Sequence, residues 1–123
     1  MAIAANVVAV DNLQHRLRKV LLLTFSGSYS SLGDTLDLTK VTNTKNLEAA
    51  LFHRNPDLFR LANPAPAGWV LEITPGTGLT NWLVLVRKQD GSTGKLPEIA
   101  AGAYDATLTG ATNIYLELEE KAS

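Results

Sequence analysis

Asn113-Ile-Tyr-Leu-Glu-Leu118 alternates apolar and polar side chains with a period of two. That period is typical of a β-strand with one buried face. It predicts that Ile114, Leu116 and Leu118 point inward, and that Tyr115, Glu117 and Glu119 point outward. Similar short apolar runs are separated by Gly, Pro, Asn and Ser, at Val20–Phe25, Trp69–Thr74, Trp82–Val86 and Ala103–Leu108. Short strands with frequent turns predict a mainly β chain.

We therefore expect an antiparallel β-sandwich or barrel, jelly-roll-like in outline, with one short helix and an extended N-terminal arm. The helix is expected at Thr44–His53, which has helical spacing of its apolar residues, with a second helical turn at Asp57–Leu61. Residues 1–16 are expected to form the arm, and residues 17–123 a single β-rich domain. Ala2–Val10 is apolar and strand-like, and it either pairs with the domain's own sheet or lies on a neighbouring subunit.

The composition of the 123 residues limits the classes of function. A chain of this length has room for one domain with its own core. The formal net charge of −1 provides no long-range field to attract nucleic acid or an anionic membrane. The chain has no cysteine, so thiolate nucleophiles, disulfides and sulfur-ligated metals are excluded. No run approaches the length of a membrane-spanning helix, and the start of the chain does not have the pattern of a secretory signal.

Candidate catalytic residues are few and scattered. His15 and His53 are the only histidines, and no Ser-His-Asp or Gly-x-Ser-x-Gly pattern accompanies them. The carboxylates are spread at about one per segment, Asp105 among them. We therefore expect a non-enzymatic protein without a cofactor or a bound metal. An enzyme that depends on His53 or Asp105 is a third alternative, after the two hypotheses given below.

The aromatic residues are expected to serve the core first. Trp69 and Trp82 are predicted to be core residues, because a small domain with few aromatics needs its tryptophans inside. Tyr115 lies on the outward face of the last strand, so it is predicted to be exposed or to contact another subunit.

Taken in order, four segments resemble the small head-decoration (cement) proteins of tailed bacteriophages. They are Thr24–Tyr29, Leu32–Leu38, Gly68–Ile73 and Asn113–Leu118. The resemblance implies a non-enzymatic virion protein on the outer capsid surface, made in the host cytoplasm. It also implies a homotrimer that clamps neighbouring subunits of the major capsid protein and so stabilises the head.

On this hypothesis the predicted contacts with the capsid or with other subunits are Ile3, Val7, Val8, Val10 and Tyr115. A tail or neck component of the virion is an alternative within the same class. The alternative from another class is a carbohydrate-binding β-sandwich module, which predicts aromatic side chains exposed on one face.

Overall fold

The structure, a computed structural model, describes residues 3–42, 52–61 and 66–121. Its longer strands are β1 (Ile3–Leu13), β2 (Arg16–Phe25), β6 (Trp69–Thr74), β7 (Trp82–Lys88) and β9 (Tyr115–Lys121). The shorter strands are β3 (Ser28–Tyr29), β4 (Asp34–Leu36), β5 (Leu58–Leu61) and β8 (Gly102–Ala103). A 3-10 turn covers Leu38–Lys40, and α1 is a single helical turn at Ala106–Thr109.

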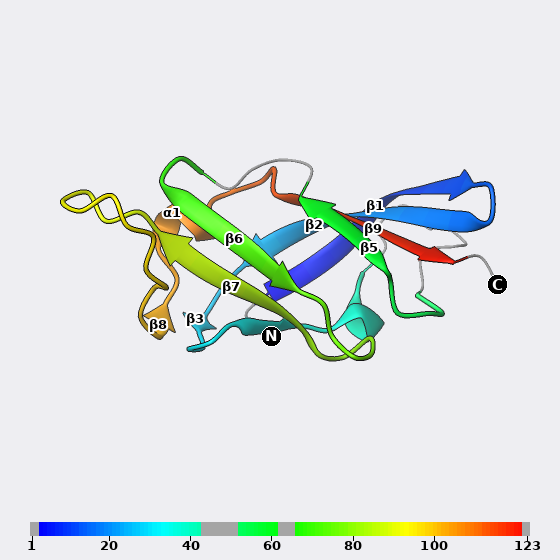
Figure 1. The fold of residues 1–123 in the computed structure, drawn as a ribbon, viewed down its shortest axis with the longest axis horizontal. Coiled ribbons are helices and arrows are strands. Elements are labelled where there is room, and N and C mark those ends of the chain that lie inside the picture. The colour runs from blue at the N-terminus through cyan, green and yellow to red at the C-terminus, as the bar shows by residue number, and fades with distance from the viewer. Residues whose placement is uncertain (1–2, 43–51, 62–65, 122–123) are drawn as a thin grey trace.

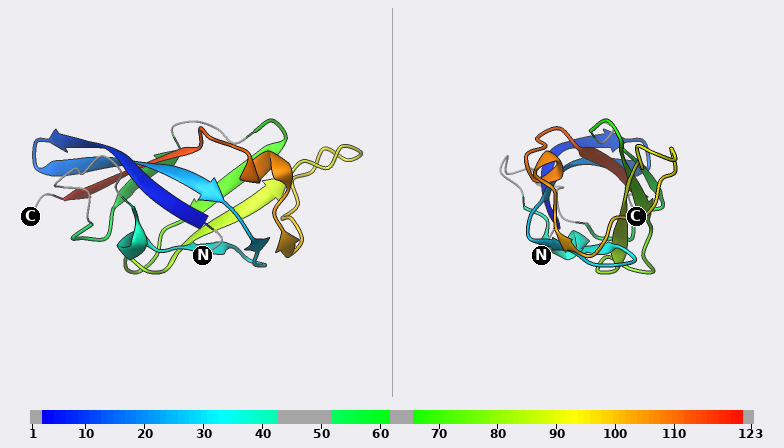
Figure 2. Two further views of the ribbon diagram at one scale, coloured as in Figure 1. Left: turned by 180° about the vertical axis from the view of Figure 1, so that it is seen from behind. Right: turned by 90° about the vertical axis from the view of Figure 1, so that its left-hand side faces the viewer.

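Two antiparallel sheets dominate the molecule (Figure 1). One has the strand order β1-β2-β9-β5 and the other β4-β7-β6, while β3 and β8 form a small third ribbon. The end-on view in Figure 2 shows the sheets curving around a common interior. The described strands do not close into a barrel, so the fold is β-sandwich-like. The expected mainly β, antiparallel class is confirmed.

The core lies between the two sheets and follows the period-two pattern of the strands. Ile114, Leu116 and Leu118 are all 0% exposed, as residues 113–118 predict. On the facing sheet Trp82, Val84 and Val86 of β7 are equally buried. Strand β7 is the middle strand of its sheet, and Leu83 and Leu85 on its other face are partly buried.

The N-terminal segment is extended, but it is not a separate arm. Strand β1 pairs antiparallel with β2 along its whole length, from Ile3 opposite Phe25 to Leu13 opposite Arg16. Its other edge is bridged at residues 5–7, because Val7 donates its N–H to the carbonyl of Thr42 at 2.8 Å and Thr42 donates to the carbonyl of Ala5 at 2.9 Å. The division into an arm of residues 1–16 and a domain of residues 17–123 is therefore corrected: β1 is a strand of the domain's own sheet.

Three short segments of the chain were predicted to form other structures than the strands and turns described above. Residues 58–61 form strand β5 rather than a helical turn, because they pair with the edge of β9. The run Ala103–Leu108 is not one strand, since Asp105 accepts the N–H of Thr107 and starts α1 at Ala106. Most of the expected helix at Thr44–His53 lies outside the described residues, and its last two residues are described without helical structure.

Candidate functional site

Arginines of strand β2 and glutamates of strand β9, which are remote in sequence, lie side by side on one face of the sheet. The basic side chains of Arg16 and Arg18 leave β2 on the outer face of the sheet, opposite the partners Lys121 and Glu119 of β9. Glu117 and Glu119 leave β9 on the same outer face. Opposite charges on neighbouring strands stabilise the pairing of the strands. The antiparallel pairing thus places residues 16–18 opposite residues 119–121, from where Arg16 and Arg18 reach Glu119 and Glu117 diagonally.

One row of ion pairs crosses the whole four-stranded sheet. Asp11 of β1 accepts Arg18 Nε at 2.9 Å, and Arg18 Nη1 donates to Glu117 Oε1 at 3.0 Å. The other oxygen of Glu117 accepts Nε of Arg60, on β5, at 2.9 Å. Carboxylates and guanidiniums therefore alternate in sign from β1 to β5.

A second, shorter row lies beside the first. Arg16 donates from Nε to Glu119 Oε1 at 3.1 Å, and its Nη2 donates to Asp57. The hydrogen bond from Arg16 lowers the pKa of Asp57 below its usual range. The two rows form a charge ladder with three arginines and four carboxylates: Asp11, Arg16, Arg18, Asp57, Arg60, Glu117 and Glu119.

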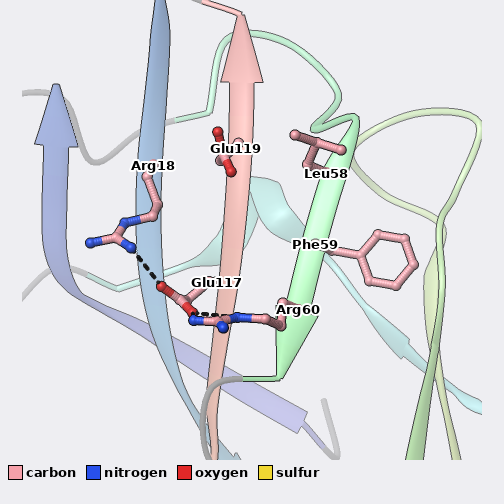
Figure 3. Close-up of a pocket in the computed structure, with 6 residues that line it drawn as sticks. All are labelled: Arg18, Leu58, Phe59, Arg60, Glu117 and Glu119. Carbon is pink, nitrogen blue, oxygen red and sulfur yellow. Dashed lines mark hydrogen bonds and ion pairs between the residues drawn. The ribbon is translucent and has the colours of Figure 1, made fainter. Parts of the chain in front are cut away.

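A pocket of about 340 Å³ lies at the β5 end of the charge ladder. Its lining consists of Arg18, Leu58, Phe59, Arg60, Glu117 and Glu119. Figure 3 shows Arg18 and Arg60 converging on Glu117, whereas the ring of Phe59 points away from them. Leu58 is 51% exposed and lies on the same face of β5 as Arg60, so apolar surface borders the ion pairs. The pocket combines an apolar rim with fixed charges of both signs.

The ring of Phe59 connects the pocket to the core. It packs edge to face against Trp82, with ring centroids 5.6 Å apart. Trp82 itself is buried, and its indole N–H donates to Asn55 Oδ1 at 2.7 Å. The prediction that Trp82 belongs to the core is confirmed. A molecule bound against Phe59 would therefore act on the environment of a buried tryptophan.

Beneath the charge ladder lies a buried ion pair on the inner face of the same sheet. Lys19 Nζ lies 2.7 Å from Glu120 Oε1, and the two side chains are 0% and 2% exposed. The other oxygen of Glu120 accepts the backbone N–H groups of His53 and Arg54 at 3.3 and 3.4 Å. Lys19 Nζ also lies 4.4 Å from the centroid of the Phe52 ring. Through these contacts the ion pair binds residues 52–54, the segment before β5, to the sheet.

The five predicted contact residues fall into two groups. Ile3 and Val7 are completely buried, and Val10 packs against the core. For Ile3 and Val7 the expectation of contact with another subunit is corrected, because their side chains are already buried in the chain's own core. Val10 is only partly buried, and its contact role stays a prediction. Val8 lies at a register irregularity in β1 and is partly exposed. Tyr115 is partly exposed on the outer face of β9, on the same side as Glu117.

The three residues considered for catalysis lie at a helix cap, in a loop and in a turn. Asp105 caps α1, and the backbone of His53 is bound by Glu120. His15 lies in the turn between β1 and β2, with φ of +66°. Within the described ranges, no three His, Cys, Asp or Glu side chains are grouped as a metal site. No helix in that part of the chain is long and apolar enough to cross a membrane.

Sequence reasoning did not predict that the basic residues near position 16 pair with the acidic residues near position 117. The signal that was available is the opposite sign of the two clusters, each on a segment predicted to be a strand. The pocket residues Leu58, Phe59 and Arg60 carried no such signal, since residues 57–61 were predicted to be helical. No family model, curated protein or solved structure matches this chain.

Proposed function

We propose that this chain is a non-enzymatic virion protein of a tailed bacteriophage, one that binds the outer capsid surface and stabilises the head. The proposal begins from the resemblance of four segments to head-decoration proteins. Its major partner is then the major capsid protein, and the protein acts on neighbouring capsid subunits as a homotrimer. The observation that carries it is the charge ladder on the outer face of the four-stranded sheet.

The charge ladder suits attachment to another protein because it is rigid and mixed in sign. Each arginine is already held by one or two carboxylates, so little side-chain entropy remains to be lost on docking. Mixed charges contribute specificity and register more than raw affinity. A complementary surface on the capsid protein would bind this face in one orientation.

The size of the face favours several copies acting together. Strands β2 and β9 share seven register pairs, and four strands form the sheet. At about 3.3 Å per residue and 4.8 Å between strands, the face covers roughly 300 Å². A stable interface buries about 800 Å² on each partner. A trimer that presents three such faces reaches this range and gains avidity.

Co-sedimentation with capsids tests the proposal. The purified chain is mixed with expanded capsids of the phage that encodes it, in low and in high salt. We expect the chain to pellet with the particles, and less of it to pellet in high salt, because salt screens exposed charges. Failure of the wild-type chain to bind these capsids would overturn the proposal. Immunogold labelling of intact virions distinguishes the capsid surface from a tail or neck position.

Matched charge reversals test the role of the charge ladder. Asp11→Lys changes an exposed carboxylate that pairs with Arg18 on the four-stranded sheet. Glu72→Lys makes the same charge change at an exposed carboxylate that pairs with Arg87 on the other sheet. We expect capsid binding to weaken with Asp11→Lys and to be preserved with Glu72→Lys. Equal effects of the two variants would contradict docking through the charge ladder.

The pocket favours a second candidate function, a carbohydrate-binding module. Its lining contains the aromatic residue Phe59 together with Arg60 and Glu117, and aromatic residues with fixed polar groups are typical of ligand sites. A glycan titration followed by tryptophan fluorescence tests this function, because Phe59 contacts Trp82. Saturable quenching that is lost in Phe59→Ala would favour the carbohydrate-binding module over the capsid protein.

A further inference from the structure

The register of the four-stranded sheet places two cations directly opposite each other at one end. Arg16, the first residue of β2, pairs with Lys121, the last residue of β9. Directly opposite side chains lie on the same face of a sheet, and like charges in this position are destabilising. This pair departs from the alternation of sign along the charge ladder, in which each arginine meets carboxylates.

The carboxylates beside this pair are occupied by Arg16. Its Nε donates to Glu119 at 3.1 Å, and its Nη2 donates to Asp57. Within residues 3–42, 52–61 and 66–121, Lys121 forms no ion pair, and neither does Arg54. Two cations at this end of the sheet therefore have no carboxylate of their own.

A second pocket, of about 200 Å³, brings these two cations together. Arg54 and Lys121 line it with Asn55 and Asp57. It lies where β2 and β5 begin and β9 ends, toward one end of the molecule (Figure 1). Two cations and one carboxylate give the lining an excess of one positive charge. A concave surface with an excess of positive charge attracts an anion.

The wall of the second pocket is held in place by contacts with the rest of the domain. Asn55 Oδ1 accepts the indole N–H of Trp82 at 2.7 Å, and Asn55 Nδ2 donates to the carbonyl of Gly76 at 2.9 Å. The backbone N–H of Arg54 donates to the buried carboxylate of Glu120 at 3.4 Å. Because this backbone is already fixed, binding of an anion costs little reorganisation.

Asp57 limits which anion the second pocket can accept. The hydrogen bond from Arg16 to its Oδ1 lowers the pKa of Asp57, so this carboxyl is ionised at neutral pH. An ionised carboxylate only accepts hydrogen bonds, and it repels an anion that has no hydrogen to donate. Inorganic phosphate keeps a P–OH hydrogen at neutral pH, whereas sulfate and the phosphodiesters of nucleic acids and lipids have none.

We propose that the second pocket binds inorganic phosphate, with Arg54 and Lys121 donating to its oxygens and Asp57 accepting its hydroxyl hydrogen. Guanidinium and ammonium groups are the usual charged donors to phosphate. The bound anion also compensates the like charges of Arg16 and Lys121 across the two strands. The inference goes beyond the proposed function, because the site requires no capsid.

A fluorescence titration tests the site, because Asn55 in the pocket wall contacts the indole of Trp82. The wild-type chain is titrated near neutral pH with sodium phosphate and separately with sodium sulfate, at constant ionic strength. Backbone amide shifts of residues 54–57, followed by NMR, report the same titrations. We expect saturable phosphate binding and about 5-fold weaker sulfate binding or less, since only phosphate donates to Asp57. A chain without saturable phosphate binding, or with equal affinity for both anions, would overturn the proposal.

Two neutral variants and a matched control locate the site. Arg54→Gln and Lys121→Gln each remove one cation of the second pocket, and each should weaken phosphate binding by about 5-fold or more. Lys95→Gln removes an exposed lysine in the loop that follows β7, and it should bind phosphate as the wild-type chain does. Equal losses in all three variants would indicate a general effect of net charge and would contradict the site.

Asp57→Asn tests the selection between the two anions. Asparagine is neutral, and its amide N–H groups can donate to sulfate. We expect the preference for phosphate over sulfate to disappear in this variant, mainly because sulfate binds more tightly. A preference that is unchanged in Asp57→Asn would refute the assignment of phosphate to this pocket.

Urea unfolding distinguishes loss of the site from loss of the fold. Lys121→Gln removes the repulsion with Arg16, so without phosphate its urea midpoint should be no lower than that of the wild-type chain. Phosphate should raise the midpoint of the wild-type chain more than that of Lys121→Gln, because a ligand stabilises only the folded state that binds it. A lower midpoint for Lys121→Gln without phosphate, or an equal rise in both chains, would contradict the inference.

Discussion

The buried ion pair between Lys19 and Glu120 makes a strong prediction about stability. Lys19→Met removes the ammonium group and leaves the carboxylate of Glu120 inside the protein, where it is 2% exposed. Removing one partner of a buried pair typically costs about 3–5 kcal/mol. The stability of a whole domain is about 5–15 kcal/mol. The variant should therefore lose a large part of its free energy of unfolding.

Urea denaturation followed by tryptophan fluorescence measures this loss. With a slope of about 1–3 kcal/mol per M, the urea midpoint should fall by roughly 2 M. The control is Glu72→Gln, which breaks the exposed pair with Arg87 and should cost about 0–1 kcal/mol. A Lys19→Met variant that is no less stable than this control would refute the reasoning.

A double variant separates the loss of the pair from the burial of a lone charge. Lys19→Met combined with Glu120→Gln removes both charges and keeps an acceptor for the N–H groups of His53 and Arg54. We expect the double variant to be more stable than Lys19→Met alone, because no unpaired charge remains inside. If the double variant were less stable than the single one, desolvation of Glu120 would not be the cause of the loss.

Three further predictions concern turns, pH and the pocket. Gly76→Ala should lower the free energy of unfolding in urea by about 1–3 kcal/mol, because a Cβ at residue 76 would lie 2.6 Å from the carbonyl carbon of Asn81. The control Gly78→Ala should cost much less, because a Cβ at residue 78 would meet open space. Burial, followed by the hydrogen bond to Glu98, raises the pKa of Tyr29 to about 12. Folding favours the neutral phenol, so its contribution to the free energy of unfolding is full below pH 10 and is lost as the pH rises toward about 12. Tyr29→Phe should therefore make the urea midpoint fall less steeply over that pH range. Phe59→Ala should cost about 1 kcal/mol and shift the tryptophan emission, whereas an unchanged emission spectrum would contradict the edge-to-face contact.

Several elements could be predicted from the sequence because their signals are local. The inward face of residues 114–118 follows from a period of two, which does not depend on the neighbouring strand. Residues 58–61 lacked such a signal, since four residues of mixed character suit a helix or a strand equally well. Their pairing with β9 decided the outcome.

The candidate site was less accessible to sequence reasoning than the fold. The hydrogen bond from Arg18 to Glu117 joins residues 99 positions apart, and the bond from Lys19 to Glu120 joins residues 101 positions apart. Local patterns contain no information about which strand becomes the neighbour, because pairing is decided by the packing of the whole chain. The predicted capsid-contact role of Ile3 and Val7 was wrong for the same reason: an apolar strand looks alike whether its partner is its own sheet or another subunit.

By itself, the sequence determined the mainly β class, the inward faces of the longer strands and the core position of Trp82, since burial of apolar surface follows the period of each strand. The tertiary structure alone decided that β1 belongs to the domain, that the arginines of β2 meet the carboxylates of β9, and that Arg54 and Lys121 line one pocket. These features depend on contacts between distant segments. Their free energy appears only when the topology brings those segments together.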